Sequence, residues 1–106
     1  MESYKLDDFF KGWVVGNFQP TLHLTSHFEV GVKHFAVGEV EAAHKQLVAT
    51  EITIVISGRI RLGKEEFSDG DIISIPPHEV ADFEALTECS LVCIKFPSLP
   101  DDKVVV

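Results

Sequence analysis

The sequence has no cluster of basic residues, no long apolar run and almost no helical periodicity. Nine Lys and Arg stand against seventeen Asp and Glu, for a formal net charge of −8. Phosphate backbones and anionic lipids are bound by clustered Lys and Arg. No stretch approaches the roughly 18 apolar residues of a membrane helix. We therefore expect neither nucleic acid nor membrane as a partner.

Secretory and redox signals are also missing. The first eight residues are acidic and carry no apolar run before a cleavage site. Cys89 and Cys93 lack the Cys-x-x-Cys spacing of a redox or zinc pair. They stand four residues apart in an apolar run, which predicts two buried, reduced thiols on one face of a strand. These features favour a cytoplasmic protein.

What the sequence does contain is a succession of short β-prone runs. Gly, Pro and Asp separate them at intervals of roughly 8–12 residues, which is typical of an all-β sandwich or barrel. Apart from a possible short helix over 6–11, we expect strands at about 12–18, 27–37, 44–50, 51–57, 59–62, 72–75, 80–86 and 89–96. Eight strands in 106 residues predict one jelly-roll domain over 1–106.

Local patterns add detail to this expectation. The alternation in 28–37 predicts a core-facing side made of Phe28, Val30, Val32, His34 and Ala36. The segment 68–71 reads Ser-Asp-Gly-Asp, which predicts a turn, and two prolines at 76 and 77 end the following strand. The proline-containing tail 97–106 is expected to be extended or frayed.

Two sets of spaced residues begin at Gly38 and Gly70. In the first set, five residues separate Gly38 from His44, one follows before Gln46, four before Glu51 and six before Gly58. In the second set, five residues separate Gly70 from Pro76, followed by Pro77 and His78, with Ala81 three residues further on. Both spacings resemble the two motifs of the cupins. The resemblance covers about 28–96 and implies a cupin-type jelly-roll β-barrel, or double-stranded β-helix, with 1–18 and 97–106 peripheral.

The resemblance also implies a site inside the barrel. Cupins usually bind a divalent metal there through two His and one Glu of the first motif and one His of the second. Here those positions are His44, Gln46, Glu51 and Ala81, so two of the four ligands have changed. One interpretation is a metal site for Zn, Fe, Mn or Ni formed by His44, Gln46 and Glu51, with His78 or water completing it. The other is a vestigial site in which Gln46 and Glu51 hydrogen-bond to His44 and to each other or to water. A lone buried carboxylate is costly, so Glu51 would be protonated or paired, with His44 as its natural partner.

Three functions stay open at this point. The first is a small-molecule-binding cupin whose ligand contacts His34, His44, Gln46, Glu51 and His78. The second is a metal-dependent isomerase or oxygenase that acts on a small carbohydrate-like or carbonyl substrate. The third is a dimeric accessory protein.

Two surface features bear on the partners. A homodimer is expected, because the apolar run 12–18 supplies an edge strand that needs covering. The stretch 65–88 has eight carboxylates and no Lys or Arg, and it encloses the second motif. This predicts an acidic barrel mouth that favours a cationic or neutral polar ligand.

Overall fold

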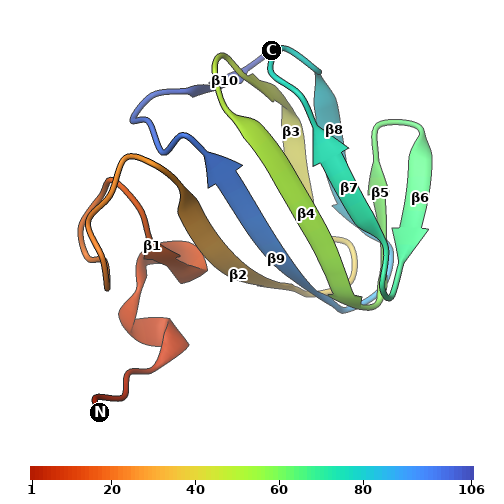
Figure 1. Cartoon of the computed structure of the whole chain (residues 1–106). Coiled ribbons are helices and arrows are strands. Elements are labelled where there is room, and N and C mark those ends of the chain that lie inside the picture. Colours follow the sequence, from red (N-terminus) through yellow and green to blue (C-terminus); the bar gives the residue numbers. More distant parts are fainter.

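A computed structural model describes all 106 residues, and it consists almost entirely of β-strands (Figure 1). The strands are β1 (Trp13–Val15), β2 (Glu29–Phe35), β3 (Val40–Gln46), β4 (Thr50–Ser57), β5 (Arg59–Leu62), β6 (Glu65–Ser68), β7 (Ile72–Ile75), β8 (Ala81–Ala85), β9 (Cys89–Phe96) and β10 (Lys103–Val105). Two single 3₁₀ turns, η1 (Leu6–Asp8) and η2 (Phe10–Gly12), precede them. Neither turn has the length or hydropathy of a helix that crosses a membrane.

The strands form two antiparallel sheets, with the orders β1-β2-β9-β4-β7 and β10-β3-β8-β5-β6. Figure 1 shows the first sheet in front and the second behind it. From β2 to β5 and again from β6 to β10, successive strands alternate between the two sheets. This alternation is the winding of a jelly roll, so the all-β prediction is confirmed.

The apolar core lies between the sheets, towards the end where β4 turns into β5. Val55 and Ile60 are fully buried there, and the rings of Phe35 and Phe83 pack with their centroids 4.6 Å apart. Gly58 makes the turn with a φ of +94°, and a Cβ at this position would lie 2.3 Å from the carbonyl oxygen of Glu88. Only glycine fits, which explains the last glycine of the first motif.

Most of the strands lie where the sequence predicts them, but two were not predicted. β6 contains one apolar side chain among polar ones, and β10 lies in the tail that we expected to be frayed. The structure corrects that expectation, because β10 pairs with β3. The buried carboxylate of Asp102 also accepts the backbone N–H groups of Val48 and Ala49 at 2.8 and 2.9 Å. The tail is therefore part of the barrel.

The prediction for the faces of 28–37 is wrong. Glu29, Lys33 and Phe35 line the cavity inside the barrel, so the odd-numbered side of β2 faces inward. The even-numbered side, which includes Val32 and His34, faces outward. Alternation reveals two unlike faces but not which one is inside, and here the inner face is charged because it lines a polar cavity. The apolar face is the outer one.

Candidate functional site

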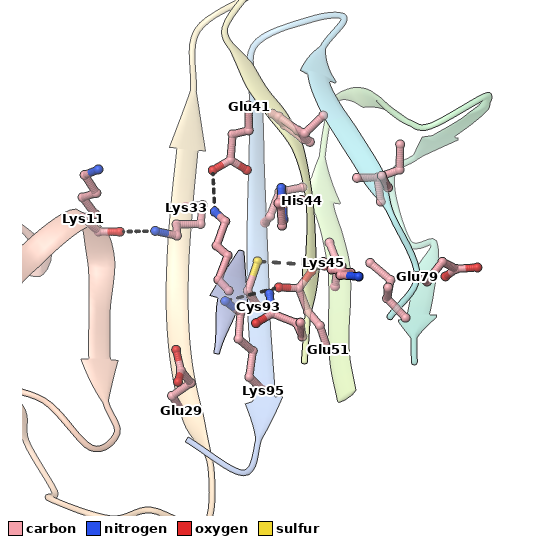
Figure 2. Close-up of a pocket in the computed structure, with 18 of the residues that line it drawn as sticks. Lys11, Glu29, Lys33, Glu41, His44, Lys45, Glu51, Glu79, Cys93 and Lys95 are labelled. Atoms are coloured by element: carbon pink, nitrogen blue, oxygen red, sulfur yellow. Dashed lines mark hydrogen bonds and ion pairs between the residues drawn. The ribbon is translucent and has the colours of Figure 1, made fainter. Parts of the chain in front are cut away.

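A cavity of about 290 Å³ lies between the two sheets, beside the apolar core. Figure 2 shows the side chains that line it, which come from both sheets and from the N-terminal segment. Its apolar wall is formed by Trp13, Phe35, Leu62, Ile75, Ala81, Phe83, Leu91 and Cys93. Its ionisable side chains are Lys11, Glu29, Lys33, Glu41, His44, Lys45, Glu51, Glu79, Lys95 and Lys103. The site is thus partly aromatic and densely charged.

The four motif positions meet in this cavity. His44 and Gln46 come from β3, Glu51 from β4 and Ala81 from β8. The pairing of β3 with β8 places His44 directly opposite Ala81. Gln46 is almost completely buried, whereas His44 is half-buried and its Nδ1 lies 2.9 Å from the carbonyl oxygen of Ala42. The spacing of the motif therefore brings its residues together around one cavity.

The structure places the two other predicted histidines outside the cavity. His34 is exposed on the outer side of β2, and its Nδ1 lies 2.7 Å from the hydroxyl of Ser90. His78 is exposed in the turn before β8, where its φ of +72° is in the left-handed region. The cupin motif has glycine at this position, and glycine is the residue that adopts this conformation most readily. His78 does not line the cavity.

Glu51 is paired, but its partner is a lysine that the motif does not contain. The Lys95 ammonium lies 3.8 Å from a carboxylate oxygen of Glu51, and both side chains are nearly buried. The hydroxyl of Thr53 donates a hydrogen bond to the same carboxylate at 3.3 Å. The expected pairing of Glu51 with His44 is therefore wrong, because Lys95 supplies the compensating charge. Figure 2 shows the contact between Lys95 and Glu51.

Trp13 forms part of the cavity wall, and its indole ring contacts two lysines. The ammonium groups of Lys33 and Lys95 lie 4.6 and 5.1 Å from the centroid of its indole, within the range of cation–π attraction. The indole lies against Gly31, where a Cβ would be only 2.7 Å from the ring. The missing side chain of Gly31 thus makes room for Trp13 over β2.

Lys33 is one of three cavity lysines, with Lys11 and Lys45, that take part in no ion pair. Its ammonium donates a hydrogen bond to the carbonyl oxygen of Lys11 at 2.7 Å, and none of the ion pairs of the structure includes it. Burial lowers the pKa of Lys33, because the charged form has lost part of its hydration. A cation in this condition gains from an anion that enters the cavity.

The charge of the cavity is opposite to the one expected. Five of the seven lysines of this acidic chain line it, against four glutamates. Of the eight carboxylates in 65–88, only Glu79 reaches it. Asp82 and Glu84 instead bind Arg61 at 3.0 and 3.4 Å. The prediction of an acidic mouth is wrong, because Asp82 and Glu84 both lie on the outer side of β8, away from the cavity that Ala81 and Phe83 line.

The donor set does not fit a divalent metal. Ala81 offers no ligand, Gln46 offers a neutral amide, and the Glu51 carboxylate already faces the Lys95 ammonium, which would repel a cation. No three His, Cys, Asp or Glu side chains in the structure are grouped to hold a metal ion. The residues therefore do not support the metal-dependent isomerase or oxygenase that the resemblance implied.

The two cysteines are buried, and their thiols are expected to be unreactive. Burial, and after it the neighbouring Glu51 carboxylate, raise the pKa of Cys93 to about 12, and burial also raises the pKa of Cys89. At pH 8 a cysteine with a pKa of about 12 has roughly a thousand-fold less thiolate than a cysteine with an ordinary pKa.

We expect iodoacetamide to leave both thiols of the folded protein unmodified and to alkylate both in urea, as read by mass spectrometry. Alkylation of Cys93 at equal rates in the two states would contradict this burial.

Sequence reasoning missed Trp13, Lys33 and Lys95. A signal for Lys95 was present, because it shares its side of β9 with the buried residues Leu91 and Cys93. A lysine on the buried side of a strand is rare unless it is paired. Lys33 lay on the face taken to be solvated, and Trp13 lay in a segment taken to be peripheral, so neither gave a usable signal.

Comparisons with known proteins give a structural likeness only. No protein-family model matches the sequence, and no curated protein does either. The structure resembles an uncharacterized conserved protein with a double-stranded β-helix domain from Klebsiella pneumoniae, with a TM-score of 0.77 and 18% identity over 98% of this chain and 90% of that one. It also resembles KdgF from Halomonas sp., with a TM-score of 0.66 and 21% identity over 71% and 74% of the two chains.

A third similar structure is a sugar phosphate isomerase from a cupin superfamily, from Silicibacter pomeroyi. Its TM-score is 0.61 and its identity 19%, over 67% of this chain and 51% of that one. All three identities are below 25%, so the likeness concerns the fold of the chain and does not extend to an activity.

Proposed function

The chain has the double-stranded β-helix fold of the cupins, and from this premise we propose that it binds a small organic anion inside its barrel. The ligand's carboxylate would interact with the ammonium groups of Lys33 and Lys95 beside Trp13. Its less polar part would lie against the aromatic and aliphatic wall around Phe35 and Phe83. In this proposal lysines take the place of the metal ion as the positive charge of the site.

The observation that carries the proposal is the gathering of lysines. Lys11, Lys33, Lys45, Lys95 and Lys103 are far apart in the sequence, yet all line one cavity of a chain with a net charge of −8. Two glutamates of the cavity are already paired, Glu51 with Lys95 and Glu41 with Lys103 at 3.6 Å. Lys33 is left without a carboxylate, and an anion inside the cavity would supply its counter-charge.

Cavity size and a similar structure support the same ligand class. About 290 Å³ suits a molecule of several non-hydrogen atoms and lies at the lower end of small-molecule sites. The similar structure from Silicibacter pomeroyi is named as a sugar phosphate isomerase, and a sugar phosphate is a small anionic carbohydrate. Binding of a small organic anion by lysines does not require a metal ion, which agrees with a donor set that does not fit a divalent metal.

Matched probes test the proposal. Calorimetry with glucuronate and glucose, and with malonate and malonamide, compares ligands that differ mainly in the carboxylate. We expect the carboxylate of each pair to bind and its neutral counterpart to bind at least ten-fold more weakly. Equal affinities within both pairs, or binding of neither carboxylate, would overturn the proposal.

The Lys33→Met variant isolates the role of the ammonium. We expect it to bind the carboxylate probes at least ten-fold more weakly and to be no less stable than the parent, since it removes a charge whose burial is unfavourable. Lys64→Met is the control, because Lys64 is exposed between β5 and β6 and does not line the cavity. Equal losses of affinity in the two variants would point to overall charge instead of the site.

The lowered pKa of Lys33 also predicts how the affinity for an anion changes with pH. Anion binding needs the protonated amine, so affinity should fall as pH rises through a pKa below that of an ordinary lysine. In Lys33→Arg the group stays charged, and the fall should move to higher pH. Identical pH profiles for the parent and the arginine variant would exclude Lys33 from the contact with the anion.

A further inference from the structure

The amine of Lys33 lies inside the cavity next to uncharged groups. Its Nζ lies 4.6 Å from the centroid of the Trp13 indole and donates a hydrogen bond to the backbone carbonyl oxygen of Lys11 at 2.7 Å. No carboxylate lies within ion-pair distance of it. A neutral amine makes the same hydrogen bond with one of its N–H groups and keeps its lone pair free. The position therefore accepts the neutral form of the amine as well as the charged one.

The surroundings of Lys33 also favour the neutral form. Burial is the main cause of its lowered pKa, because the charged form loses hydration inside the barrel. The Cys93 thiol and the Glu41 carboxylate oppose this shift of the pKa. The positive charges of Lys103 and Lys95 add to it. A lysine that is desolvated or lies beside another cation is an activated nucleophile, since the free amine and not the ammonium attacks a carbonyl group.

Lys95 supplies a cation next to this amine. It forms an ion pair with Glu51, which only its charged form can make, and its ammonium lies 5.1 Å from the centroid of the same Trp13 indole. Two amines beside one ring are neighbours, and each stands on a flexible four-carbon stem. A ligand whose carboxylate meets the Lys95 ammonium thus brings its adjacent carbon atom within reach of Lys33. In a 2-oxo acid that adjacent atom is a carbonyl carbon, the electrophile that an amine attacks.

We propose that Lys33 forms an imine with the carbonyl carbon of a small 2-oxo acid whose carboxylate faces Lys95. This inference rests on the proposed function, because a 2-oxo acid is one of the small organic anions that the cavity is proposed to bind. A volume of about 290 Å³ accommodates a 2-oxo acid of three or four carbon atoms. Lys33 is then a nucleophile as well as a cation, and the ligand needs a carbonyl group next to its carboxylate.

Imine formation needs no reagent other than the lysine and the 2-oxo acid. The Lys33 ammonium first loses a proton, and the lone pair of the neutral amine forms the new C–N bond. The π electrons of the carbonyl group move to its oxygen, which takes one hydrogen from the nitrogen. The oxygen then leaves as water with the proton released in the first step, and the nitrogen lone pair completes the C=N bond. The protonated imine retains the positive charge of the ammonium, so it still attracts the carboxylate beside it.

Reductive trapping with pyruvate tests the imine. Cyanoborohydride delivers a hydride to a protonated imine and leaves a stable secondary amine, which peptide mapping by mass spectrometry locates. We expect Lys33 to be labelled at least ten-fold faster than Lys64, which is exposed and does not line the cavity. Malonate has no ketone and should slow the labelling of Lys33 at least ten-fold without changing that of Lys64. Equal rates at the two lysines, or labelling of Lys33 that bound malonate does not slow, would overturn the proposal.

Substitutions at position 33 show whether this amine is the nucleophile. Lys33→Arg keeps a positive charge but replaces the amine by a guanidinium. It should still bind malonate in calorimetry, while its total incorporation of pyruvate falls to that of the exposed lysines. Lys33→Met should show the same fall, and it decides the question if the arginine does not fit the cavity. Undiminished incorporation in both variants would assign the label to another lysine and contradict the proposal.

Calorimetry with malonate distinguishes failure of the imine from failure of the anion site. A parent that binds malonate but is labelled at Lys33 no faster than at Lys64 contradicts the imine and leaves the anion site supported. A parent that binds neither malonate nor pyruvate contradicts the proposed function itself, and the imine with it.

Discussion

Replacing Asp102 by alanine is expected to lower the free energy of unfolding by about 3 kcal/mol, because two backbone N–H groups lose a charged acceptor inside the protein. Asp102 is only 7% exposed, and its two carboxylate oxygens accept from Val48 and Ala49 at 2.8 and 2.9 Å. Its own carbonyl oxygen accepts the N–H of Leu47 at 2.9 Å. These bonds hold the loop between β3 and β4 against the C-terminal segment.

Urea denaturation measures this loss. Asp102→Asn keeps one acceptor oxygen and should fall between alanine and the parent. Asp7→Ala is the control for loss of an acidic charge, because Asp7 is exposed in η1 and its side chain makes no hydrogen bond in the structure. If Asp102→Ala and Asp7→Ala change the unfolding free energy by similar amounts, the tail is not the structural part of the barrel that we infer.

The second large effect concerns the ion pair between Lys95 and Glu51 inside the cavity. Lys95→Met should lower the free energy of unfolding by about 2 kcal/mol, because it leaves the Glu51 carboxylate without its counter-ion. Removing one partner of a fully buried pair costs roughly 3–5 kcal/mol. The 3.8 Å separation and the polar cavity reduce the cost here. The hydrogen bond from Thr53 compensates only part of the lost charge.

A double-mutant cycle isolates that interaction. Adding Glu51→Gln to Lys95→Met removes the uncompensated charge and should recover about 1–2 kcal/mol, whereas Glu51→Gln alone should destabilise the protein by leaving Lys95 unpaired. Urea denaturation of the parent, both single variants and the double variant gives the coupling energy. Strictly additive effects would show that Lys95 and Glu51 do not compensate each other. Binding of the carboxylate probes to the double variant should stay weak even where stability is restored.

Several predictions that came from short-range patterns agree with the structure. The alternating and β-branched runs indicate β4 and β9, and the Ser-Asp-Gly-Asp segment indicates the turn before β7, where the Asp71 carboxylate accepts the N–H of Ser68 at 2.8 Å. The spacing from Gly38 to Gly58 indicates that His44, Gln46 and Glu51 share one cavity, and they do. Each of these signals lies within about twenty residues of chain, where backbone geometry relates spacing to position.

The sequence by itself determined that this protein is an acidic, all-β chain with a degenerate cupin motif. Only the tertiary structure decided the chemistry of the cavity. Period-two alternation distinguishes two faces of a strand but does not say which one is inside, so Lys33 and His34 were assigned to opposite sides from those they occupy. Lysines at 11, 33, 45, 95 and 103 have no pattern along the chain, and they meet because strands distant in sequence are neighbours in the sheets. An overall charge of −8 therefore coexists with a cavity in which lysines outnumber glutamates, because net charge is a sum over the chain and the charge of a cavity depends on where each residue lies.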